Sequence, residues 1–516
     1  MFYELLSFNK KSIPSYFLLL ICLYPISTLI GSFFENLNII LLGLVSTFYL
    51  FKNKNLIKSN HLLLIFFFLI IFLNALNSEN TDNILKSLKY IIYLSILLFC
   101  FTVKFEKNIF QLFQKIFIFI IITLFILMID MMVQKFAGYN LMGYKSLECY
   151  FDSLKIDNCR VSGFFGDEYV AGSFISRILV IVSIYYLTIE KRFKILIPFL
   201  ILSFVAIYFS GERMAMGLSI QVYLIIIIYL FLLQKEKLNF LKLSVFSLII
   251  ITTLLLTLSQ NTSIRFSKGI KLLYNKDYYK LDISTNHTSD FQAFKFKDKY
   301  IGKEFELVPN EIYGYYVING NIKEFTAINL NNLNFVPAFL SKSKFKIDTE
   351  SLKKPRSVAL IKSTQKINKH FFNSTGWSAH FIAAYKIFEK NFFLGTGFKS
   401  FYRECIQLDK INHIYDNHKC SIHPHNYHLE ILQSLGVLGY ISFLILIYCL
   451  FMLVIKNKNL SFIDKFLIIA LLFVIYQPIT TSGSIFSSAF ANKLWFISSI
   501  IILLSRLKAY KNEFNF

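Results

Sequence analysis

The stretch SIHPHNYHLEILQSLGVLGY, residues 421–440, joins a histidine-rich polar segment to an apolar run that continues to about Lys456. An apolar run of this length is enough to cross the roughly 30 Å of hydrocarbon in a bilayer. Polar residues that can carry chemistry therefore stand at the end of a predicted membrane helix. This arrangement indicates a reaction at a membrane surface.

The composition of the chain indicates that lipid is its main solvent. Of its 516 residues, 55% are hydrophobic, 17% aromatic and only 16% charged, whereas soluble domains carry about a quarter charged residues. We therefore predict an α-helical polytopic membrane protein with about 12 transmembrane helices. No cleavable signal peptide is evident, because the first apolar run is long and no A-x-A pattern follows it. The predicted spans lie at about 14–30, 36–51, 61–77, 84–102, 111–134, 168–187, 193–209, 214–234, 240–258, 428–455, 462–480 and 484–505.

Basic residues alternate between the connections that join these spans. Connections such as 52–58 and 191–194 are rich in Lys and Arg, whereas 31–35 carries none. Under the positive-inside rule, this alternation predicts cytoplasmic termini and places the long loops 135–167 and 259–427 outside. The net charge of +23 then follows from orientation and from a Lys-rich outer loop. Membrane lipids are the expected surroundings, and no nucleic acid partner is expected.

The outer insertion divides the membrane part of the chain. We predict a membrane domain with spans 1–9 at 1–258, a periplasmic loop at 259–427, and a membrane domain with spans 10–12 at 428–516. Within the loop, residues 281–365 contain short alternating or β-branched runs broken by Gly, Asn and Pro. Such runs predict a small β-containing subdomain.

Residues 376–401, in the same loop, change to helical spacing and end near two glycines, Gly395 and Gly397. Helical spacing followed by glycines predicts an amphipathic helix on or near the membrane and then a tight turn. The expected architecture is thus a bundle of membrane helices with one large outer loop.

The cysteines give an independent test of sidedness. Cys149 and Cys159 form one close pair and Cys405 and Cys420 another, and all four fall in loops assigned to the outside. Disulfides persist in oxidising compartments such as the bacterial periplasm. We therefore expect two local disulfides, with four free thiols as the alternative. No C-x-x-C pair accompanies them, so no metal site is expected.

His425 and Asn426 stand at the outer, amino-terminal end of the span that follows them. Unpaired N–H groups and the helix dipole favour an anion there, and a histidine can take a proton from a hydroxyl near neutral pH. The alternative is a histidine that only anchors the helix end. The nearby His423 and His428 favour a site, and Asn426 is expected to orient the imidazole or a sugar hydroxyl.

Further along the same span, two glycines stand three residues apart. Gly436 and Gly439 are predicted to lie on one helix face and to let a neighbouring helix approach closely. His423, Arg177 and Glu430 are kept as secondary candidates for the site.

Two arginines precede other spans on the predicted outer side. Arg160 directly follows Cys159, and Arg213 opens the eighth span. The guanidinium group is planar, stays charged and matches phosphate oxygens, so two arginines beside a histidine suit a diphosphate. Interfacial anchoring or a salt bridge, for instance to Glu212, Asp167 or Glu168, is the alternative.

Arg177 and Lys493 lie within predicted spans, where a charge is costly and usually functional or paired. Asp130 is a possible partner for either one, and the sequence does not decide between them.

Four motifs together resemble one known family, the O-antigen ligase and polymerase-like membrane proteins. HNYHLEILQSLGVLG (425–439) resembles the family's H-N-x9-G-x-x-G signature, and LGTGFKSF (394–401) resembles its Gly-x-Gly element. RVSGFFGDEYVAG (160–172) is similar to its Arg-x-x-Gly-x-Phe segment, and SGERMAMG (210–217) to its short Arg-bearing segment. The chain departs from the family around Trp377, where relatives often carry an arginine, and in the insertion 281–365.

The resemblance implies a glycosyltransferase of the bacterial inner membrane that acts on the periplasmic side. Its donor would be a glycan on undecaprenyl diphosphate, and its acceptor a hydroxyl on lipid A-core or on another glycan. His425 corresponds to the family's catalytic histidine, followed by Asn426, while Arg160 and Arg213 correspond to the arginines that bind the diphosphate. The resemblance implies no cofactor and no metal.

Three alternatives to an O-antigen ligase remain open. A polymerase of repeat units uses the same donor and similar residues, so the sequence barely separates the two. Protein O-glycosylation is less expected because no large soluble carboxy-terminal domain is evident. A flippase or transporter would place ionisable or helix-breaking residues near mid-membrane in matching halves, whereas the candidate groups here gather at one face.

Overall fold

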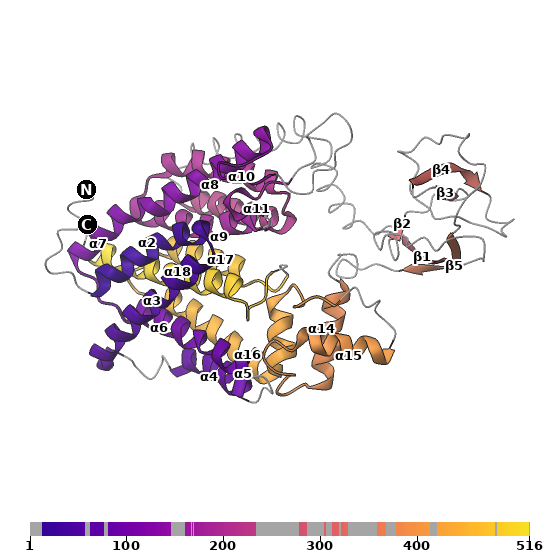
Figure 1. The fold of residues 1–516 in the computed structure, drawn as a ribbon. Coiled ribbons are helices and arrows are strands. Elements are labelled where there is room, and N and C mark those ends of the chain that lie inside the picture. The colour runs from indigo at the N-terminus through magenta and orange to yellow at the C-terminus, as the bar shows by residue number, and fades with distance from the viewer. Residues whose placement is uncertain are drawn as a thin grey trace. The chain divides into compact units, whose positions relative to one another are not determined.

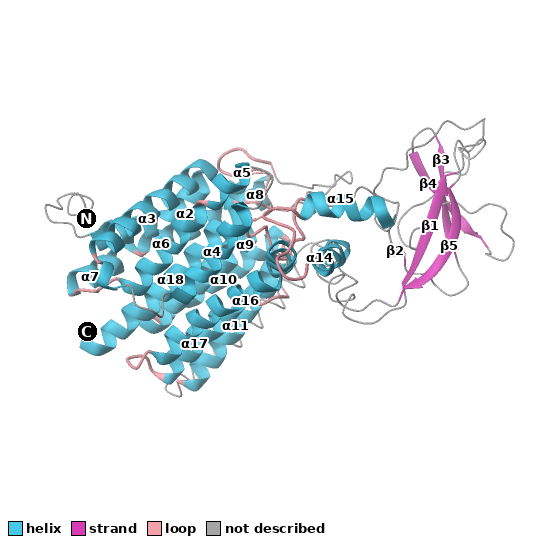
Figure 2. Ribbon diagram, turned by 90° about the horizontal axis from the view of Figure 1, so that it is seen from below, coloured by secondary structure: helices cyan, strands magenta, loops and turns pink. Residues whose placement is uncertain are grey.

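The structure is a computed structural model. It describes residues 13–56, 62–76, 81–145, 160–166, 168, 170–233, 378–412, 420–479 and 482–514, together with five strands between residues 278 and 367. The chain forms two compact units: Met1–Ser267 with Ala379–Phe516, and Lys268–Ser378. Figure 2 shows that the long helices belong to the first unit and the strands to the second.

The amino-terminal part of the helical unit consists of α-helices with short 3-10 and π segments between them. Glycines in the left-handed region end two of these helices, Gly138 after α8 and Gly211 after α10. The elements are α2 (Ile13–Ile30), α3 (Ser32–Lys52), η1 (Lys54–Leu56), α4 (Leu62–Leu76), α5 (Thr81–Ser87), α6 (Lys89–Thr102), α7 (Lys107–Ile116), α8 (Ile118–Ala137), η3 (Gly163–Phe165), α9 (Ala171–Ile184), the π-helical η4 (Tyr185–Glu190), α10 (Phe193–Ser210) and α11 (Arg213–Leu232).

The carboxy-terminal part adds two short helices and three longer ones to the same unit. They are α14 (Ser378–Lys390), α15 (Phe401–Asn412), α16 (Tyr427–Lys456), α17 (Phe462–Tyr476) and α18 (Ser488–Phe514). α14 lies inside the range 376–401 for which the sequence predicts an amphipathic helix, whereas α15 was not predicted.

Among the described residues, nine helices are long and apolar enough to cross a membrane. Two further predicted spans correspond to the shorter helices α4 and α17, each of 15 residues. The predicted span 240–258 lies outside the described residues. The architecture is therefore that of an α-helical membrane protein, and the count of twelve spans stays a prediction.

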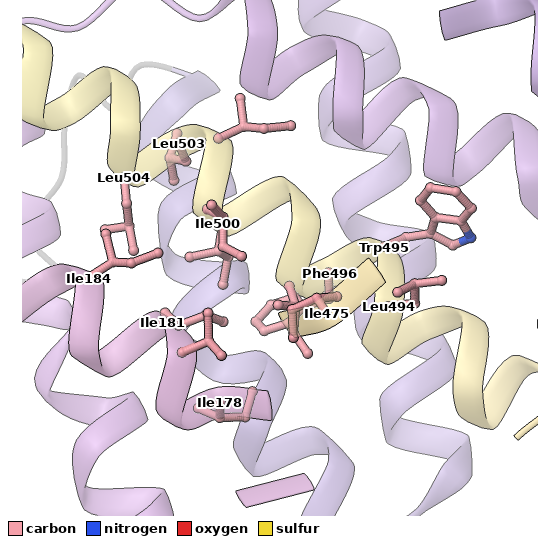
Figure 3. Packing of buried hydrophobic residues seen from close by; sticks show 14 of the residues in the cluster. Ile178, Ile181, Ile184, Ile475, Leu494, Trp495, Phe496, Ile500, Leu503 and Leu504 are labelled. Atoms are coloured by element: carbon pink, nitrogen blue, oxygen red, sulfur yellow. The ribbon is translucent and has the colours of Figure 1, made fainter. Parts of the chain in front are cut away.

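The core of the bundle is built around α9 and α18. Nearly all residues of α9 are buried, and Ile178 and Ile181 of this helix lie in the same cluster as Ile500 and Leu503 of α18 (Figure 3). Helices that are apolar on all sides suit either a buried position or a lipid environment. Outer helices such as α3 and α4 instead expose large apolar side chains, among them Phe48 and Leu69.

The bundle has one end rich in basic residues. There, the Lys511 ammonium donates to the carbonyl of Ile189 at 2.7 Å, so the ends of η4 and α18 meet. Both figures draw the start of α2 at this end as well (Figures 1 and 2). Because α9 and η4 run toward this end, the starts of α9 and α18 lie at the opposite end of the bundle.

The second unit is described through its strands β1 (Tyr278–Thr285), β2 (Glu304–Phe305), β3 (Ile312–Ile318), β4 (Asn321–Ile328) and β5 (Ala359–Ile367). β1 is central in a three-stranded antiparallel sheet of order β2-β1-β5, with a register shift at Asp282/Ile283 in its pairing with β5. β3 and β4 form a separate antiparallel pair. These strands fall in and around the range 281–365, in which the sequence predicts a β-containing subdomain.

Candidate functional site

The start of α16 is fixed by the side chain of Asn426. Its Oδ1 accepts from the Leu429 N–H at 3.0 Å and so caps the helix, while its Nδ2 donates to the Pro478 carbonyl at 2.7 Å. The amide oxygen and the amide nitrogen of Asn426 thus both hold the backbone at the start of α16 in place. These two hydrogen bonds position the backbone that carries His425, and the role of Asn426 in orienting the imidazole or a sugar hydroxyl stays a prediction.

A loop at residues 482–487, before α18, holds the same segment from another side. The backbone N–H of Ser482 donates to the His425 carbonyl at 2.8 Å, and the Ser482 hydroxyl accepts from the Tyr427 N–H at 2.9 Å. The buried carboxylate of Glu430 accepts from the Ser484 hydroxyl and from the Ile485 N–H at 2.7 Å. In this structure, Glu430 ties the loop to α16.

Three imidazoles gather just before α16. The ring centroid of His425 lies 4.3 Å from that of His423 and 5.4 Å from that of His380. His425 also has φ 56°, a left-handed conformation that is uncommon outside glycine and is enriched at functional sites. His380 comes from α14, and the sequence does not predict its place in the site because no spacing rule connects two residues so far apart along the chain.

The surroundings of the three rings favour their neutral forms. Burial, with added repulsion from His423 and His380, lowers the pKa of His425 to about 3. Burial likewise lowers the pKa of His423 and of His380 below the ordinary histidine value. At neutral pH the His425 imidazole therefore carries no charge and can accept a proton.

Arg160 packs against the turn between α10 and α11. Its Nε donates to the Ser210 carbonyl at 3.0 Å, and its side chain lies over Gly211, where a Cβ would stand 3.5 Å from the arginine. The neighbouring Glu212 carboxylate accepts from the Gly172 N–H at 2.7 Å at the start of α9. Arg213 follows as the first residue of α11, and its side chain is exposed.

Arg177 connects two parts of the site. One is the arginine-bearing turn at residues 210–213, and the other is the histidine segment at residues 420–426. Arg177 lies five residues beyond Gly172, about 8 Å along the axis of α9, and its Nη1 donates back to the Ser173 carbonyl at 3.1 Å. Its guanidinium carbon stands 5.3 Å from the centroid of the Phe490 ring, which in turn lies 5.6 Å from that of Tyr427. The arginines and the histidines therefore share one end of the bundle, opposite to the basic end.

The two charged residues inside predicted spans have separate surroundings. Lys493 lies over the ring of Phe165 at 5.5 Å and within electrostatic range of Glu35 and Glu212. Asp130, considered from sequence as a partner for Lys493 or Arg177, instead accepts from the Leu141 N–H at 2.8 Å and from the Asn140 amide at 3.3 Å.

α16 is interrupted at one residue, and the backbone groups freed there hold the glycine element (residues 394–401) against this helix. Gly436 has φ 65° and ψ −168°, so the helix is interrupted there. The freed carbonyl of Ser434 accepts from the Gly397 N–H at 2.9 Å, and the Val437 N–H donates to the Phe392 carbonyl at 2.8 Å. A break at membrane depth is tolerated when the freed backbone groups find partners in this way.

This geometry corrects the role expected for Gly436 and Gly439. The expected role was close approach of a second helix along a regular helix face. A Cβ at Gly436 would instead overlap the Phe393 carbonyl, and one at Gly439 would overlap the side chain of Leu435, one turn earlier in the same helix. Gly395 lies directly against the broken turn of α16, since a Cβ at Gly395 would overlap the backbone of Ser434 and of Gly436.

A disulfide joins α15 to the histidine segment. Cys405 and Cys420 are bonded, with their Cα atoms 5.8 Å apart, which confirms this predicted pair. Cys149 and Cys159 lie outside the described residues. Since Cys420 precedes His423 by only three residues, the bond restrains the start of the candidate site.

The part of the chain that the structure describes contains no group of three or more His, Cys, Asp or Glu residues placed to hold a metal ion. No protein-family model matches the chain, and a search of curated proteins finds no match either.

Proposed function

We propose that the protein is an O-antigen ligase-like glycosyltransferase, which moves a glycan from undecaprenyl diphosphate to a hydroxyl of lipid A-core. The observation that carries the proposal is the placement of His425 at the same end of the bundle as Arg160 and Arg213. A base that is uncharged at neutral pH can activate a hydroxyl, and paired guanidinium groups can stabilise a departing diphosphate.

The reaction then proceeds by direct displacement. His425 takes the proton of the acceptor hydroxyl while the hydroxyl oxygen attacks the anomeric carbon of the donor sugar. The bond from that carbon to the diphosphate oxygen breaks, and the oxygen keeps the electron pair. Arg160 and Arg213 offset the negative charge that develops on the diphosphate.

The remaining residues of the site act by position in this proposal. Asn426 and Glu430 hold the backbone of the histidine segment through the hydrogen bonds described above. His423 and His380 help to keep His425 uncharged. Arg177 supports the start of α9, to which Glu212 and the arginine-bearing turn are attached.

The proposed location is the bacterial inner membrane, with the site on the periplasmic face and both termini in the cytoplasm. The basic residues at the end of the bundle opposite to the site support this orientation under the positive-inside rule. The disulfide beside the site supports an oxidising compartment.

The proposal is tested by replacing His425 with asparagine. Asparagine tolerates the left-handed backbone at this position better than alanine does, so His425→Asn should fold. We expect the rate of glycan transfer to fall about 10²–10⁴-fold, the typical contribution of a general base. The measurement is transfer from an undecaprenyl-diphosphate-linked glycan by purified protein, with folding checked by size-exclusion chromatography.

Ile422→Asn is the matched control, because Ile422 is 81% exposed and lies in the same segment. The control should retain the wild-type rate. Wild-type transfer by folded His425→Asn would rule out the proposed base.

A deletion strain distinguishes a ligase from a polymerase. Loss of all glycan-capped lipopolysaccharide, while lipid-linked chains still polymerise, indicates a ligase. Glycan caps shortened to one repeat unit indicate a polymerase.

A further inference from the structure

Three lysines that the proposed mechanism does not use lie near the histidine segment. Lys86 and Lys89 are three residues apart at the junction of α5 and α6, a spacing that brings side chains to one helix face. Lys399 lies on the segment between the glycine turn and α15, and the charges of all three act on one another. Lys89 is half-buried, while Lys86 and Lys399 are exposed.

Direct contacts hold the two lysine-bearing elements together. The Asn83 amide donates to the Phe398 carbonyl at 3.4 Å, and the Phe398 ring lies 4.6 Å from the ring of Phe486. The Lys89 ammonium donates to the Phe486 carbonyl at 2.8 Å. Lys399, next to Phe398, is therefore positioned across from Lys89.

Lys86, Lys89 and Lys399 form a lysine cluster. This cluster and His425 are attached to opposite ends of the loop at residues 482–487. Ser482 bonds to the His425 carbonyl, and Phe486 accepts from Lys89. Four residues span at most about 14 Å when fully extended. A single substrate molecule can therefore contact the lysines with one group while another of its groups reaches the histidine.

The local charge balance favours an anion at the lysine cluster. Glu430 is the acidic group whose charge acts on Lys89 and Lys399, and its oxygens already accept from Ser484 and Ile485. Burial and repulsion from Lys86 lower the pKa of Lys399. In addition, the positive-inside rule does not explain these lysines, because they stand at the end of the bundle opposite to the basic connections.

We propose that Lys86, Lys89 and Lys399 form a binding subsite for a phosphate group on the acceptor glycolipid. The charges of the three ammonium groups repel one another, so a phosphate bound among them offsets that repulsion, and lysine binds phosphate as a point charge. This inference rests on the proposed transfer function and names the substrate class: the acceptor is an anionic, phosphate-bearing glycolipid.

The test is a binding measurement that needs no turnover. The full-length protein in detergent is titrated with a fluorescent acylated glucosamine disaccharide that carries one phosphate, and with its dephosphorylated form. We expect the phosphorylated probe to bind at least tenfold more tightly to the wild-type protein, and this advantage to shrink as salt is added.

The variant Lys86→Gln/Lys399→Gln should bind both probes about equally. Lys89 is retained because its hydrogen bond to Phe486 holds the loop. The matched control is Lys386→Gln/Lys390→Gln on α14, which removes the same charge from a neighbouring helix and should keep the phosphate preference.

Equal binding of the two probes by the wild-type protein would overturn the subsite, and so would an equal loss of preference in the control. Displacement of the probe by phosphatidylglycerol vesicles as effectively as by unlabelled phosphorylated disaccharide would identify a general lipid-headgroup contact and would also overturn it. A phosphate-dependent binding that persists without any glycan transfer would instead contradict the proposed function and support the subsite.

Discussion

At the scale of single residues, the chemistry of the site depends on the charge state of His425. The two neighbouring imidazoles come from its own segment and from α14, and together with burial they bring its pKa to about 3. An isolated histidine at a helix end would instead titrate near 6.5. The neighbours thus widen the pH range over which His425 is an uncharged acceptor.

Replacing His423 with glutamine removes one of the groups that repel a proton on His425. We therefore expect the pKa of His425 to rise toward 6.5, and the acid limb of the pH–rate profile to move to higher pH. In the wild-type protein this limb should lie well below 6.5. Initial transfer rates between pH 4 and pH 8 test this: the wild-type rate should stay level down to pH 4, whereas the rate of His423→Gln should fall at the acid end of the range.

Folding must be checked at each pH in this experiment. An unfolded chain binds more protons at His425 than the folded chain between pH 6.5 and about 3, so acidification through this window lowers stability. Two results would contradict the role of His423 and His380 in lowering the pKa of His425. One is an acid limb near 6.5 in the wild-type protein, and the other is an acid limb that does not move in folded His423→Gln.

At the scale of elements, the break in α16 connects the membrane helix to the outer segment that leads to α15. Gly436 adopts backbone angles that are essentially restricted to glycine, and its freed neighbours bond to residues 392–397. The break, the glycine turn and the Cys405–Cys420 bond restrain the polypeptide on both sides of the histidine segment.

Gly436→Ala should therefore destabilise the protein by about 3 kcal/mol or more, because a Cβ would be strained and would overlap the Phe393 carbonyl. Gly217→Ala, within α11, is the matched control, since no atom lies within 4 Å of a Cβ at that position. The control should be neutral or gain about 0.5–1 kcal/mol. Reversible unfolding in mixed micelles compares the two, and equal stability would argue against the break.

At the scale of the whole molecule, the two ends of the bundle differ in chemistry. One end carries the basic connections and the ends of η4 and α18, and the other carries the histidines, the arginine-bearing turn and the disulfide. This asymmetry predicts the orientation in the membrane, because basic connections are retained on the cytoplasmic side.

Single added cysteines test this orientation. Lys390→Cys on α14 and Lys54→Cys in η1 are both at exposed positions near opposite ends. We expect a membrane-impermeant maleimide to label Lys390→Cys in intact spheroplasts and Lys54→Cys only after permeabilisation. The parent protein without either change measures background labelling, and the reverse pattern would invert the proposed topology.

Part of this organisation was predictable because its physical causes are local. Apolar runs long enough to span a bilayer predicted the helices, and two cysteines 15 residues apart predicted the bond that the structure contains. The H-N-x9-G-x-x-G pattern likewise pointed to His425, beside which the rings of His423 and His380 lie. Local sequence suffices where a helix or a short loop is decided by neighbours along the chain.

The tertiary structure alone decided how distant residues meet. Asn426 acts as a cap because Pro478 and Leu429 bring partners to both ends of its amide. His380 of α14 lies beside His425 because α14, α15 and Leu429 of α16 share a small apolar cluster. Gly436 breaks its helix because residues 392–397 supply replacement hydrogen bonds. Helix propensity and hydrophobic period carry no information about such partners, since these contacts depend on how separate elements pack against one another.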